Sequence, residues 1–385
     1  MRRMCSFALC LALLLPCLWC AAPAARAEEP LDIAAPSAIL IDAATGTVLY
    51  EKNADEVLPP ASVTKIMTLL LVMEALDSGK ISMDDSVVAS DAAAAKGGSQ
   101  VYLKPGEQMS MDEMLKSVVV SSANDCATAL AEHVAGSERA FVALMNERAN
   151  SLGMTNTHFV NCTGLDDEAA AAEHLTTARD IAVMSRELLK HEKIRDYTTI
   201  WMDTVRGGQF GLSNTNKLVR FYKGTTGLKT GYTSKAGHCL SASAERDGIE
   251  LIAVVLHCAS STDRFESAKA LLDYGFANYA LVTPDTDVSL TPIPVRLGRQ
   301  DSITPELQNR DKILIDKAKQ SQVERSVTLE EQLDAPIAAG QRVGTLTISA
   351  GGEILKEIPI ISPQEVEKLT FWDVAKRLFR SLCMG

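Results

Sequence analysis

Three short motifs in the chain carry the groups that acyl transfer needs. They are Ser62-Val63-Thr64-Lys65, Ser122-Ala123-Asn124 and Lys229-Thr230-Gly231, in that order along the chain. Together they supply a hydroxyl nucleophile, two amines, a second hydroxyl, an amide and a glycine-opened strand. Each motif alone is weak, because Ser-x-x-Lys occurs by chance in many chains of this length. The three together predict a site that opens an acyl bond without histidine, aspartate or metal.

The first motif is predicted to begin a buried helix. Residues three apart share one side of a helix, so the Lys65 amine would lie beside the Ser62 hydroxyl. Lysine accepts a proton only when its pKa is lowered, which burial or a nearby cation achieves. The helix start at Ser62 would also present backbone N–H groups to a developing negative charge. An exposed helix face is the alternative, but residues 66–71 are almost all apolar, so we expect a central helix.

The second motif is predicted to lie in the connection between two helices. There Ser122 and Asn124 could simply cap a helix, since both residue types are good caps. In the functional interpretation Ser122 relays a proton toward the leaving amine. Asn124 would then hydrogen-bond a substrate amide carbonyl and brace Lys65.

The third motif is predicted to start a strand. A strand edge aligns an extended peptide, and Gly231 would permit a close backbone approach. Lys229 and Thr230 would hold a substrate carboxylate. Lys-Thr-Gly in isolation means little, so this assignment depends on the other two motifs.

The elements around the motifs predict an α+β fold. Strands occur at both ends of this part of the sequence, with helices between them, which favours an antiparallel sheet covered by helices over a doubly wound parallel sheet. The expected strands are 37–42, 47–50, 229–231, 240–244 and 251–256, and the expected helices are 62–76, 110–120, 125–134, 138–152, 176–190 and 262–274.

The chain is predicted to contain four segments. Arg2 and Arg3 precede the apolar run 7–19, and Ala25-Arg26-Ala27 fits a signal-peptidase site. An uncleaved anchor is the alternative, but the run is short for a membrane span. We expect export to the extracytoplasmic face of a bacterial cytoplasmic membrane. The predicted segments are a signal peptide (1–27), a catalytic domain (28–282), a small β domain (283–363) and a terminal helix (364–385).

The terminal helix is predicted to be amphipathic. Phe371, Leu378 and Phe379 fall on one side, and Arg377 and Arg380 fall on the other. It is too short and too charged to span a bilayer, and a basic helix with aromatic residues suits a membrane surface. The alternative is a helix that packs its apolar side on the protein's own β domain.

Charge and cysteine content exclude some classes of function. Without residues 1–27 the chain has 35 basic and 49 acidic side chains, a balance of −14 that disfavours nucleic acid as a partner. The five remaining cysteines and six scattered histidines have no metal-ligand spacing, so we expect no metal and no cofactor. Cys239 and Cys258 could pair across two strands, although small buried side chains are the favoured interpretation.

The motifs resemble those of the low-molecular-mass serine penicillin-binding proteins, which are D-alanyl-D-alanine carboxypeptidases. The resemblance covers residues 35–280 and extends to the β domain and the terminal helix, as in the membrane-anchored members. It implies a β-lactamase/transpeptidase-like fold, peptidoglycan pentapeptide stems as substrate and β-lactam antibiotics as covalent inhibitors. The matching stretches are 60–68, 121–125, 227–233, Ala236-Gly237, Arg264 and 271–276.

The resemblance also implies individual roles. Ser62 would be the acylated nucleophile and Lys65 the general base, with Ser122, Asn124 and Lys229 in support.

Other roles that the resemblance implies fall on the third motif and a later arginine. The backbone N–H groups of Ser62 and Tyr232 would form the oxyanion hole, and Arg264 would lie near the carboxylate site. Some family members carry histidine at the position of Tyr232, so this departure bears on pH dependence and leaves the reaction class unchanged.

Two other functions fit the same three motifs. A class A β-lactamase needs a glutamate-bearing loop to hydrolyse its acyl-enzyme quickly, but residues 166–173 contain no Glu-x-x-x-Asn arrangement. A non-catalytic penicillin-binding protein would keep the fold, although the intact Ser62 and Lys65 favour an enzyme. Acylation by penicillin would separate these hypotheses.

Overall fold

The protein is described by a computed structural model that covers residues 31–166 and 172–384. The predicted signal peptide (1–27) lies outside the described residues, as does the centre of the polar segment 166–173. Buried apolar side chains form one cluster between residues 39 and 256 and another between residues 293 and 366. The predicted domain boundaries stay predictions.

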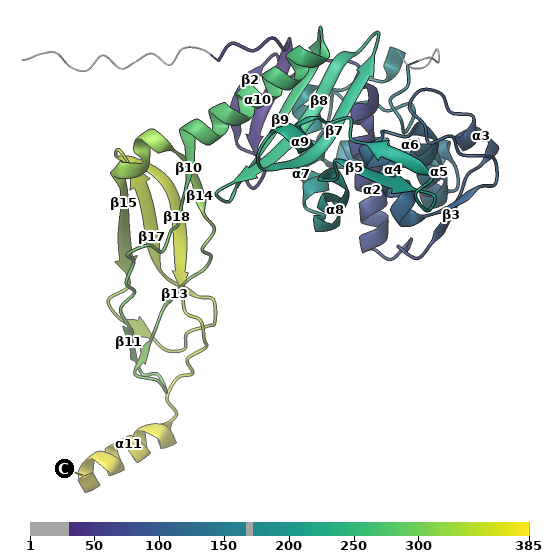
Figure 1. The fold of residues 1–385 in the computed structure, drawn as a ribbon. Helices are drawn as coiled ribbons and strands as arrows, with labels where there is room; N and C mark the ends of the chain where they lie inside the picture. Colours follow the sequence, from purple (N-terminus) through teal and green to yellow (C-terminus); the bar gives the residue numbers. More distant parts are fainter. Residues whose placement is uncertain (1–30, 167–171, 385) are drawn as a thin grey trace, which may run out of the picture. The chain divides into compact units, whose positions relative to one another are not determined.

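A five-stranded antiparallel sheet contributes one of its faces to the first cluster, and its strand order is β2-β1-β9-β8-β7 (Figure 1). The central strand β9 is apolar along most of its length, because helices cover both of its faces. Asp247 and Gly248 have positive φ values and form the tight turn between β8 and β9. The predicted α+β architecture is therefore confirmed. The strands are β1 (Ser37–Asp42), β2 (Val48–Lys52), β7 (Thr225–Thr233), β8 (Gly237–Arg246) and β9 (Ile249–Cys258).

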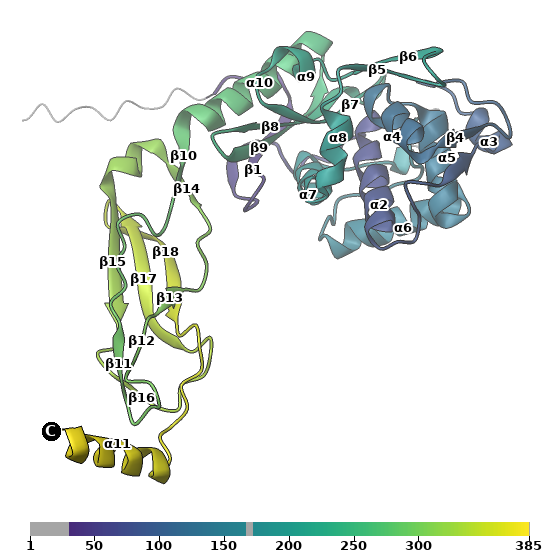
Figure 2. The same cartoon turned by 60° about the horizontal axis from the view of Figure 1, so that its bottom comes forward.

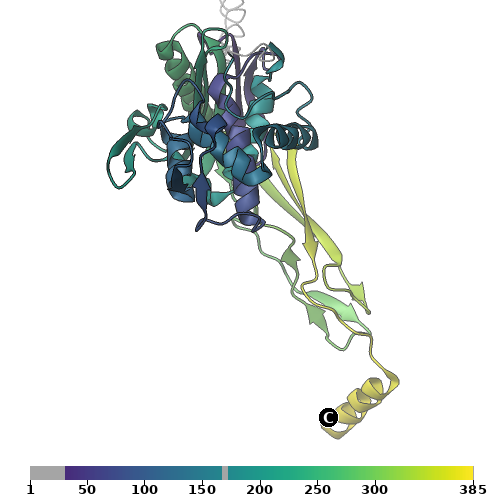
Figure 3. The same cartoon turned by 90° about the vertical axis from the view of Figure 1, so that its right-hand side faces the viewer.

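Helices lie on both sides of this sheet. Helix α10 packs against β8 and β9 on one face, and α7 packs against β1 and β9 on the other (Figure 2). Helices α5, α6 and α7 contact α2, which is central among them (Figure 3). The helices are α2 (Lys65–Asp77), α3 (Asp91–Ala94), α4 (Met111–Val120), α5 (Asn124–Ala135), α6 (Glu138–Ser151), α7 (Ala178–Leu189), α8 (Arg195–Thr198), α9 (Leu218–Phe221) and α10 (Ser261–Asn278), with 3-10 turns η2 (Ala61–Thr64) and η4 (Glu192–Ile194).

Side-chain caps start several of these helices within one residue of the predicted bounds. The hydroxyl of Ser110 accepts from the Glu113 N–H at the start of α4, and Ser137 and Thr177 cap α6 and α7 in the same way. The sequence did not predict two small hairpins that join the helices. Their strands are β3 (Ser86–Val88) with β4 (Gln108–Ser110), and β5 (Met202–Val205) with β6 (Phe210–Ser213).

The second cluster of buried side chains lies in a region of short strands, as predicted. Its largest sheet has the order β13-β18-β17-β15, and a smaller sheet has the order β12-β11-β16. Strand β14 pairs with β10, which follows α10 directly. The strands are β10 (Tyr279–Val282), β11 (Ile293–Arg296), β12 (Ser302–Ile303), β13 (Glu306–Leu307), β14 (Ile313–Asp316), β15 (Val323–Leu329), β16 (Leu333–Asp334), β17 (Arg342–Ala350) and β18 (Glu353–Ile361), with a 3-10 turn η5 (Lys317–Gln322).

The last helix, α11 (Phe371–Met384), lies within the predicted terminal segment 364–385 but begins seven residues later than its start. Its polar side makes contacts within the protein, for example between the Arg377 guanidinium and Asp301 at 2.8 Å. The apolar side of the helix is exposed. The exposed fraction is 61–83% for Phe371, Trp372, Leu378, Phe379 and Leu382. Among the described residues, no helix is long and apolar enough to cross a bilayer.

Cys239 and Cys258 are both buried and both free. The favoured interpretation of these residues as small buried side chains is confirmed, and the alternative of a cross-strand pair is wrong in this structure. A free cysteine packs as a small hydrophobe, which suits the two central strands.

The loop 161–165 approaches the η2 turn so closely that there is no room for a side chain at Gly164. This glycine has φ +81°, and a Cβ atom there would overlap the carbonyl of Ala61 and lie 2.7 Å from Thr64 Oγ1. The Asn161 side chain shapes the loop, because its Oδ1 accepts from the backbone N–H groups of Thr163 and Gly164.

We expect Gly164→Ala to lower the free energy of unfolding by about 3 kcal/mol or more, from backbone strain and steric overlap combined. Gly153→Ala is the control, because Gly153 has φ +74° but no atom within 4 Å of the place that a Cβ would take. It should cost only about 1 kcal/mol. Urea denaturation measures both, and equal costs would show that the close approach at Gly164 is not tight.

Candidate active site

The Ser62 hydroxyl and the Lys65 amine are in direct contact. Ser62 lies in the 3-10 turn η2, and Lys65 is the first residue of α2, so the first turn is tighter than the predicted α-helix. Side chains three residues apart eclipse one another in a 3-10 turn. Lys65 Nζ accordingly lies 2.9 Å from Ser62 Oγ. The expected side-by-side arrangement is present, with a closer geometry than a regular helix would give.

Lys65 is completely buried, and its surroundings favour the neutral amine. Burial lowers its pKa to about 7, against a smaller opposing effect from Cys162 and Asp125. Its Nζ donates a hydrogen bond to the Thr163 carbonyl at 2.8 Å. A neutral amine held by this carbonyl has a lone pair free for the Ser62 proton. Lys65 can therefore act as a base near neutral pH.

Strand β7 passes directly beside Ser62. A Cβ atom on Gly231 would lie 2.7 Å from the Pro60 carbonyl and 3.0 Å from the backbone nitrogens of Ser62 and Val63. Only glycine allows this approach. The peptide that leads from Gly231 to Tyr232 thus begins against the Ser62 backbone, where two N–H groups could stabilise an oxyanion.

Lys229 is the second fully buried lysine, with 1% of its surface exposed. Burial lowers its pKa well below the ordinary value, and the charges of Lys65 and Arg264 add to this effect. Its Nζ donates to the Thr230 carbonyl at 3.0 Å, and the Thr230 hydroxyl donates to Thr215 at 2.7 Å. A bound carboxylate would offset the burial and favour the ammonium form. Two buried lysines that make no ion pair within the described residues are typical of a functional site.

Ser122 lies in the connection between α4 and α5, as predicted. Its side chain is buried, and its φ of +63° is unusual for a residue other than glycine. The N-cap of α5 is Ala123, which makes no side-chain capping bond. The capping interpretation of Ser122 and Asn124 is therefore not supported at this helix start. Left-handed backbone at a buried serine is more typical of functional positions.

Asn124 is held by the segment 97–99, which the sequence did not indicate. Its Nδ2 donates to the Gly97 carbonyl, and its backbone N–H donates to the Ser99 carbonyl, both at 2.7 Å. Its Oδ1 is buried without a hydrogen-bond partner among the described residues. The N–H group of a substrate amide could donate to Oδ1 and supply that partner. The role of bracing Lys65, which we expected of Asn124, is filled at 2.8 Å by the Thr163 carbonyl.

Tyr232 and Arg264 lie next to Gly231, the former as the following residue of β7 and the latter through a hydrogen bond. The Tyr232 ring is 59% exposed and stacks on His238 at 4.3 Å between centroids. The Arg264 guanidinium is buried and donates to the Gly231 carbonyl at 3.2 Å and the Cys239 carbonyl at 3.4 Å. Arg264 therefore holds β7 where this strand meets Ser62, and its expected place near the carboxylate site stays a prediction.

Several residues that the sequence did not indicate hold the motifs in place. Besides the Thr163 carbonyl, these include Asp125, whose carboxylate accepts from the Val101 and Leu103 N–H groups, and His174, whose Nε2 lies 2.7 Å from Thr64 Oγ1. The sequence Asn-x-x-Gly at 161–164 is a turn signal that could have marked the loop. In the described parts of the chain, no three His, Cys, Asp or Glu side chains gather as metal ligands would.

The fold and the site are typical of a serine acyl-transfer enzyme, and a buried lysine lies beside the serine hydroxyl. Residues 24–260 match the D-alanyl-D-alanine carboxypeptidase family, and residues 276–368 match the C-terminal domain of penicillin-binding protein 5. The chain belongs to the D-alanyl-D-alanine carboxypeptidase family, as its resemblance implied.

Individual relatives cover most of the chain. D-alanyl-D-alanine carboxypeptidase DacF of Bacillus subtilis is 41% identical over 89% of this chain and 88% of its own length. DacC of Escherichia coli is 36% identical over 93% of this chain and 92% of its own length. The crystal structure of penicillin-binding protein 5 from Haemophilus influenzae is 30% identical, covers 88% of this chain and 99% of its own, and superposes with a TM-score of 0.75.

We expect the Lys65 amine to titrate with a midpoint near pH 7, because burial disfavours its charged form. The measurement is ¹H–¹³C NMR of protein labelled at the lysine ε-carbons, titrated from pH 5 to pH 11. Lys65→Arg removes one signal and so assigns it. A Lys65 midpoint near the ordinary value of lysine would contradict a base that is neutral near pH 7.

Proposed function

We propose that this protein is a serine D-alanyl-D-alanine carboxypeptidase that removes the terminal D-alanine from peptidoglycan pentapeptide stems through an acyl-enzyme on Ser62. The observation that carries the proposal is the contact of 2.9 Å between Ser62 Oγ and a buried Lys65 amine whose pKa is about 7. The membership of the chain in this family supports the choice of substrate.

The proposed reaction has two steps. In the first, Lys65 takes the Ser62 proton while Ser62 Oγ attacks the carbonyl between the two D-alanines. The N–H groups of Ser62 and Tyr232 stabilise the oxyanion, and Ser122 relays a proton to the leaving amine. Free D-alanine departs and a serine ester remains. In the second step a water molecule attacks the ester, which restores Ser62 and releases the shortened stem.

Charge at the third motif fits a substrate with a free carboxylate. Lys229 and Thr230 lie on the strand that passes Ser62, and the ammonium form of Lys229 is disfavoured by burial and by the charges of Lys65 and Arg264. Binding of the terminal carboxylate restores a favourable pair of charges in a dry site. The buried Asn124 Oδ1, which has no hydrogen-bond partner among the described residues, supports a contact with the substrate backbone. This arrangement favours cleavage at the end of a peptide over cleavage within it.

β-Lactam antibiotics are the second class of ligand that we propose. They present a strained amide and a carboxylate, the same two groups as the peptide end. Two solved structures of Listeria monocytogenes penicillin-binding protein D2, 31% and 32% identical to this chain, are of its ampicillin-bound and cefotaxime-bound forms. We propose that such compounds acylate Ser62. A non-catalytic penicillin-binding protein would also be acylated, so D-alanine release distinguishes it from the enzyme.

We further propose that the protein is exported and attaches to the outer surface of the cytoplasmic membrane through α11. The apolar side of this helix is exposed, and Lys376, Arg377 and Arg380 supply cations along it. An amphipathic helix of this kind binds the interface between water and lipid without spanning it. The apolar segment 7–19 and the small residues at 25–27 support export.

Ser62→Ala is expected to abolish D-alanine release from a D-Ala-D-Ala pentapeptide, because no other nucleophile is proposed. Ser78→Ala, at the far end of α2, is the control and should keep the wild-type rate. Thermal unfolding of both variants verifies the fold. Unchanged D-alanine release by Ser62→Ala would refute the assignment of the nucleophile.

Deletion of residues 369–385 is expected to move the protein from lipid vesicles to the soluble fraction, because it removes the exposed apolar side of α11. Sedimentation with vesicles that contain an anionic lipid measures this. Ile354→Ser is the matched control, since Ile354 is 61% exposed but lies on β18. Vesicle binding by the shortened protein would point to another membrane contact.

A further inference from the structure

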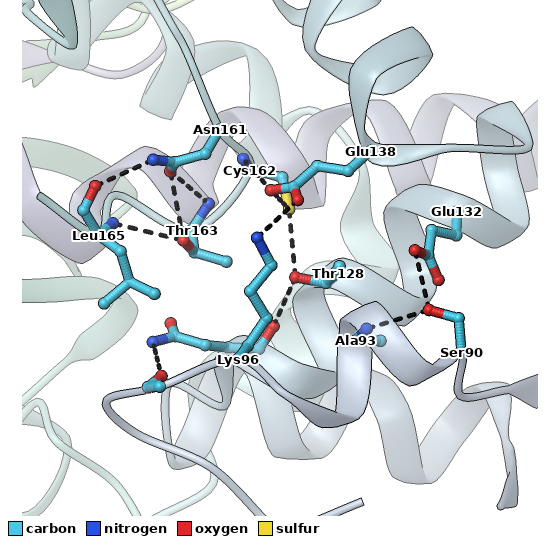
Figure 4. Close-up of polar contacts among 12 residues, drawn as sticks. Ser90, Ala93, Lys96, Thr128, Glu132, Glu138, Asn161, Cys162, Thr163 and Leu165 are labelled. Atoms are coloured by element: carbon cyan, nitrogen blue, oxygen red, sulfur yellow. Dashed lines mark hydrogen bonds and ion pairs between the residues drawn. The ribbon is translucent and has the colours of Figure 1, made fainter. Parts of the chain in front are cut away.

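The Glu138 carboxylate joins two segments that are far apart in the sequence. It lies at the start of α6, where a negative charge is favoured by the helix dipole. One of its oxygens forms an ion pair with Lys96 at 2.7 Å. The other oxygen accepts hydrogen bonds from the backbone N–H and the thiol of Cys162, both at 3.2 Å. Figure 4 shows Glu138 between these two partners.

The first partner belongs to the segment that holds Asn124. Lys96 is followed by Gly97, whose carbonyl accepts from Asn124 Nδ2, and by Ser99, whose carbonyl accepts from the Asn124 N–H. The fit is tight, because a Cβ atom on Gly98 would lie 2.7 Å from Asn124 Nδ2. A shift of Lys96 would therefore move the amide that faces the substrate.

The second partner belongs to the loop that holds the catalytic amine. The carbonyl of Cys162 accepts from the Thr68 hydroxyl on α2 at 2.7 Å. The next carbonyl, of Thr163, accepts from Lys65 Nζ at 2.8 Å. Figure 4 also shows the Cys162 thiol near Thr128 on α5, at 3.7 Å. The loop thus connects Glu138 to the helix that carries Lys65.

Charges in this network are fixed near neutral pH. Burial opposes ionisation of Glu138, but Lys96 and the Cys162 donors hold its pKa below the ordinary value. Burial, with Glu138 next to it, raises the pKa of the Cys162 thiol, which stays protonated and donates. The carboxylate is therefore a permanent acceptor for both segments.

We propose that Glu138 is a positioning residue for acyl transfer at Ser62, because one carboxylate fixes both the segment that holds Asn124 and the loop whose Thr163 carbonyl holds Lys65. The inference rests on the proposed function for the roles of Asn124 and Lys65. Within the described part of the chain, Glu138 itself makes no hydrogen bond or ion pair with Ser62 or Lys65. Its effect on the reaction is transmitted through backbone carbonyls.

Two substitutions test the proposal by the rate of acylation with a fluorescent penicillin. Glu138→Gln keeps an oxygen for Cys162 but loses the ion pair with Lys96, and we expect about a tenfold lower second-order rate constant. Glu138→Ala loses both connections, and we expect about a hundredfold loss. Lys96→Gln should match Glu138→Gln. The double variant Lys96→Gln/Glu138→Gln should be acylated no more slowly than either single variant, because each substitution removes the same ion pair.

The matched control is Glu74→Gln. Glu74, on α2, forms an ion pair at 2.7 Å with Arg148, which lies on α6 as Glu138 does. The exposure of this ion pair is similar to that of the pair between Lys96 and Glu138. We expect its acylation rate to stay within about twofold of wild type. Thermal unfolding of all variants shows how much stability each substitution costs. Equal rate losses in Glu74→Gln and Glu138→Gln would overturn the proposal, because they would report general loosening of α6.

The Lys65 titration gives a readout that loss of stability alone would not change. Lys65 faces Asp125 on α5, Cys162 in the loop, Lys229 on β7 and His174. Glu138→Ala loosens the Thr163 carbonyl, and the loss of this acceptor for Lys65 Nζ disfavours the ammonium. We therefore expect the NMR midpoint of Lys65 to fall below that of wild type in Glu138→Ala and to stay unchanged in Glu74→Gln.

The outcomes separate this inference from the proposed function. If wild-type protein is acylated and Glu138→Ala and Glu138→Gln keep both its rate and its Lys65 midpoint, Glu138 is not a positioning residue. If wild-type protein is not acylated at all, the proposed function fails. The Lys65 midpoint then still decides whether Glu138 holds the loop.

Discussion

The burial of an amine beside a hydroxyl is the constraint on which the rest of this structure depends. Lys65, the first residue of α2, is buried against Ser62 and the loop 161–165, and it makes no ion pair within the described residues. Desolvation of a lysine destabilises its charged form, and folding must tolerate a neutral amine in the interior. The surrounding fold provides one carbonyl acceptor, from Thr163, and a hydroxyl, from Ser62. A buried neutral amine is unfavourable in an ordinary core, but here it can act as a base near neutral pH.

The other features of the site follow from this arrangement. A 3-10 turn eclipses Ser62 and Lys65, and glycines at 164 and 231 let the loop and the strand approach the turn. The sheet contributes a second buried lysine, Lys229, whose ammonium form a bound carboxylate would favour. We propose different roles for the two amines because their partners differ. The Lys65 amine contacts a hydroxyl, whereas the Lys229 amine would bind an anion.

The sequence indicated the groups that we propose react, but it did not indicate the groups that hold them. Hydrophobic periodicity and caps indicated most helices, and the three motifs indicated Ser62, Lys65 and Lys229. The Thr163 carbonyl, which accepts from the amine, is a backbone group and leaves no signal in residue type. Glu138 and Lys96 pair across 42 positions of sequence, a contact that only the folded chain shows. The 3-10 geometry also could not be predicted, because Ser-x-x-Lys fits an α-helix equally well.

The central claim is that Ser62 forms a covalent ester during turnover of a D-Ala-D-Ala peptide. The most direct test is tandem mass spectrometry of protein quenched in acid while it turns over an excess of pentapeptide. The account predicts an adduct on Ser62 that adds the mass of the pentapeptide minus the mass of free D-alanine. D-alanine release without an adduct on Ser62, or with an adduct on another residue, would contradict it.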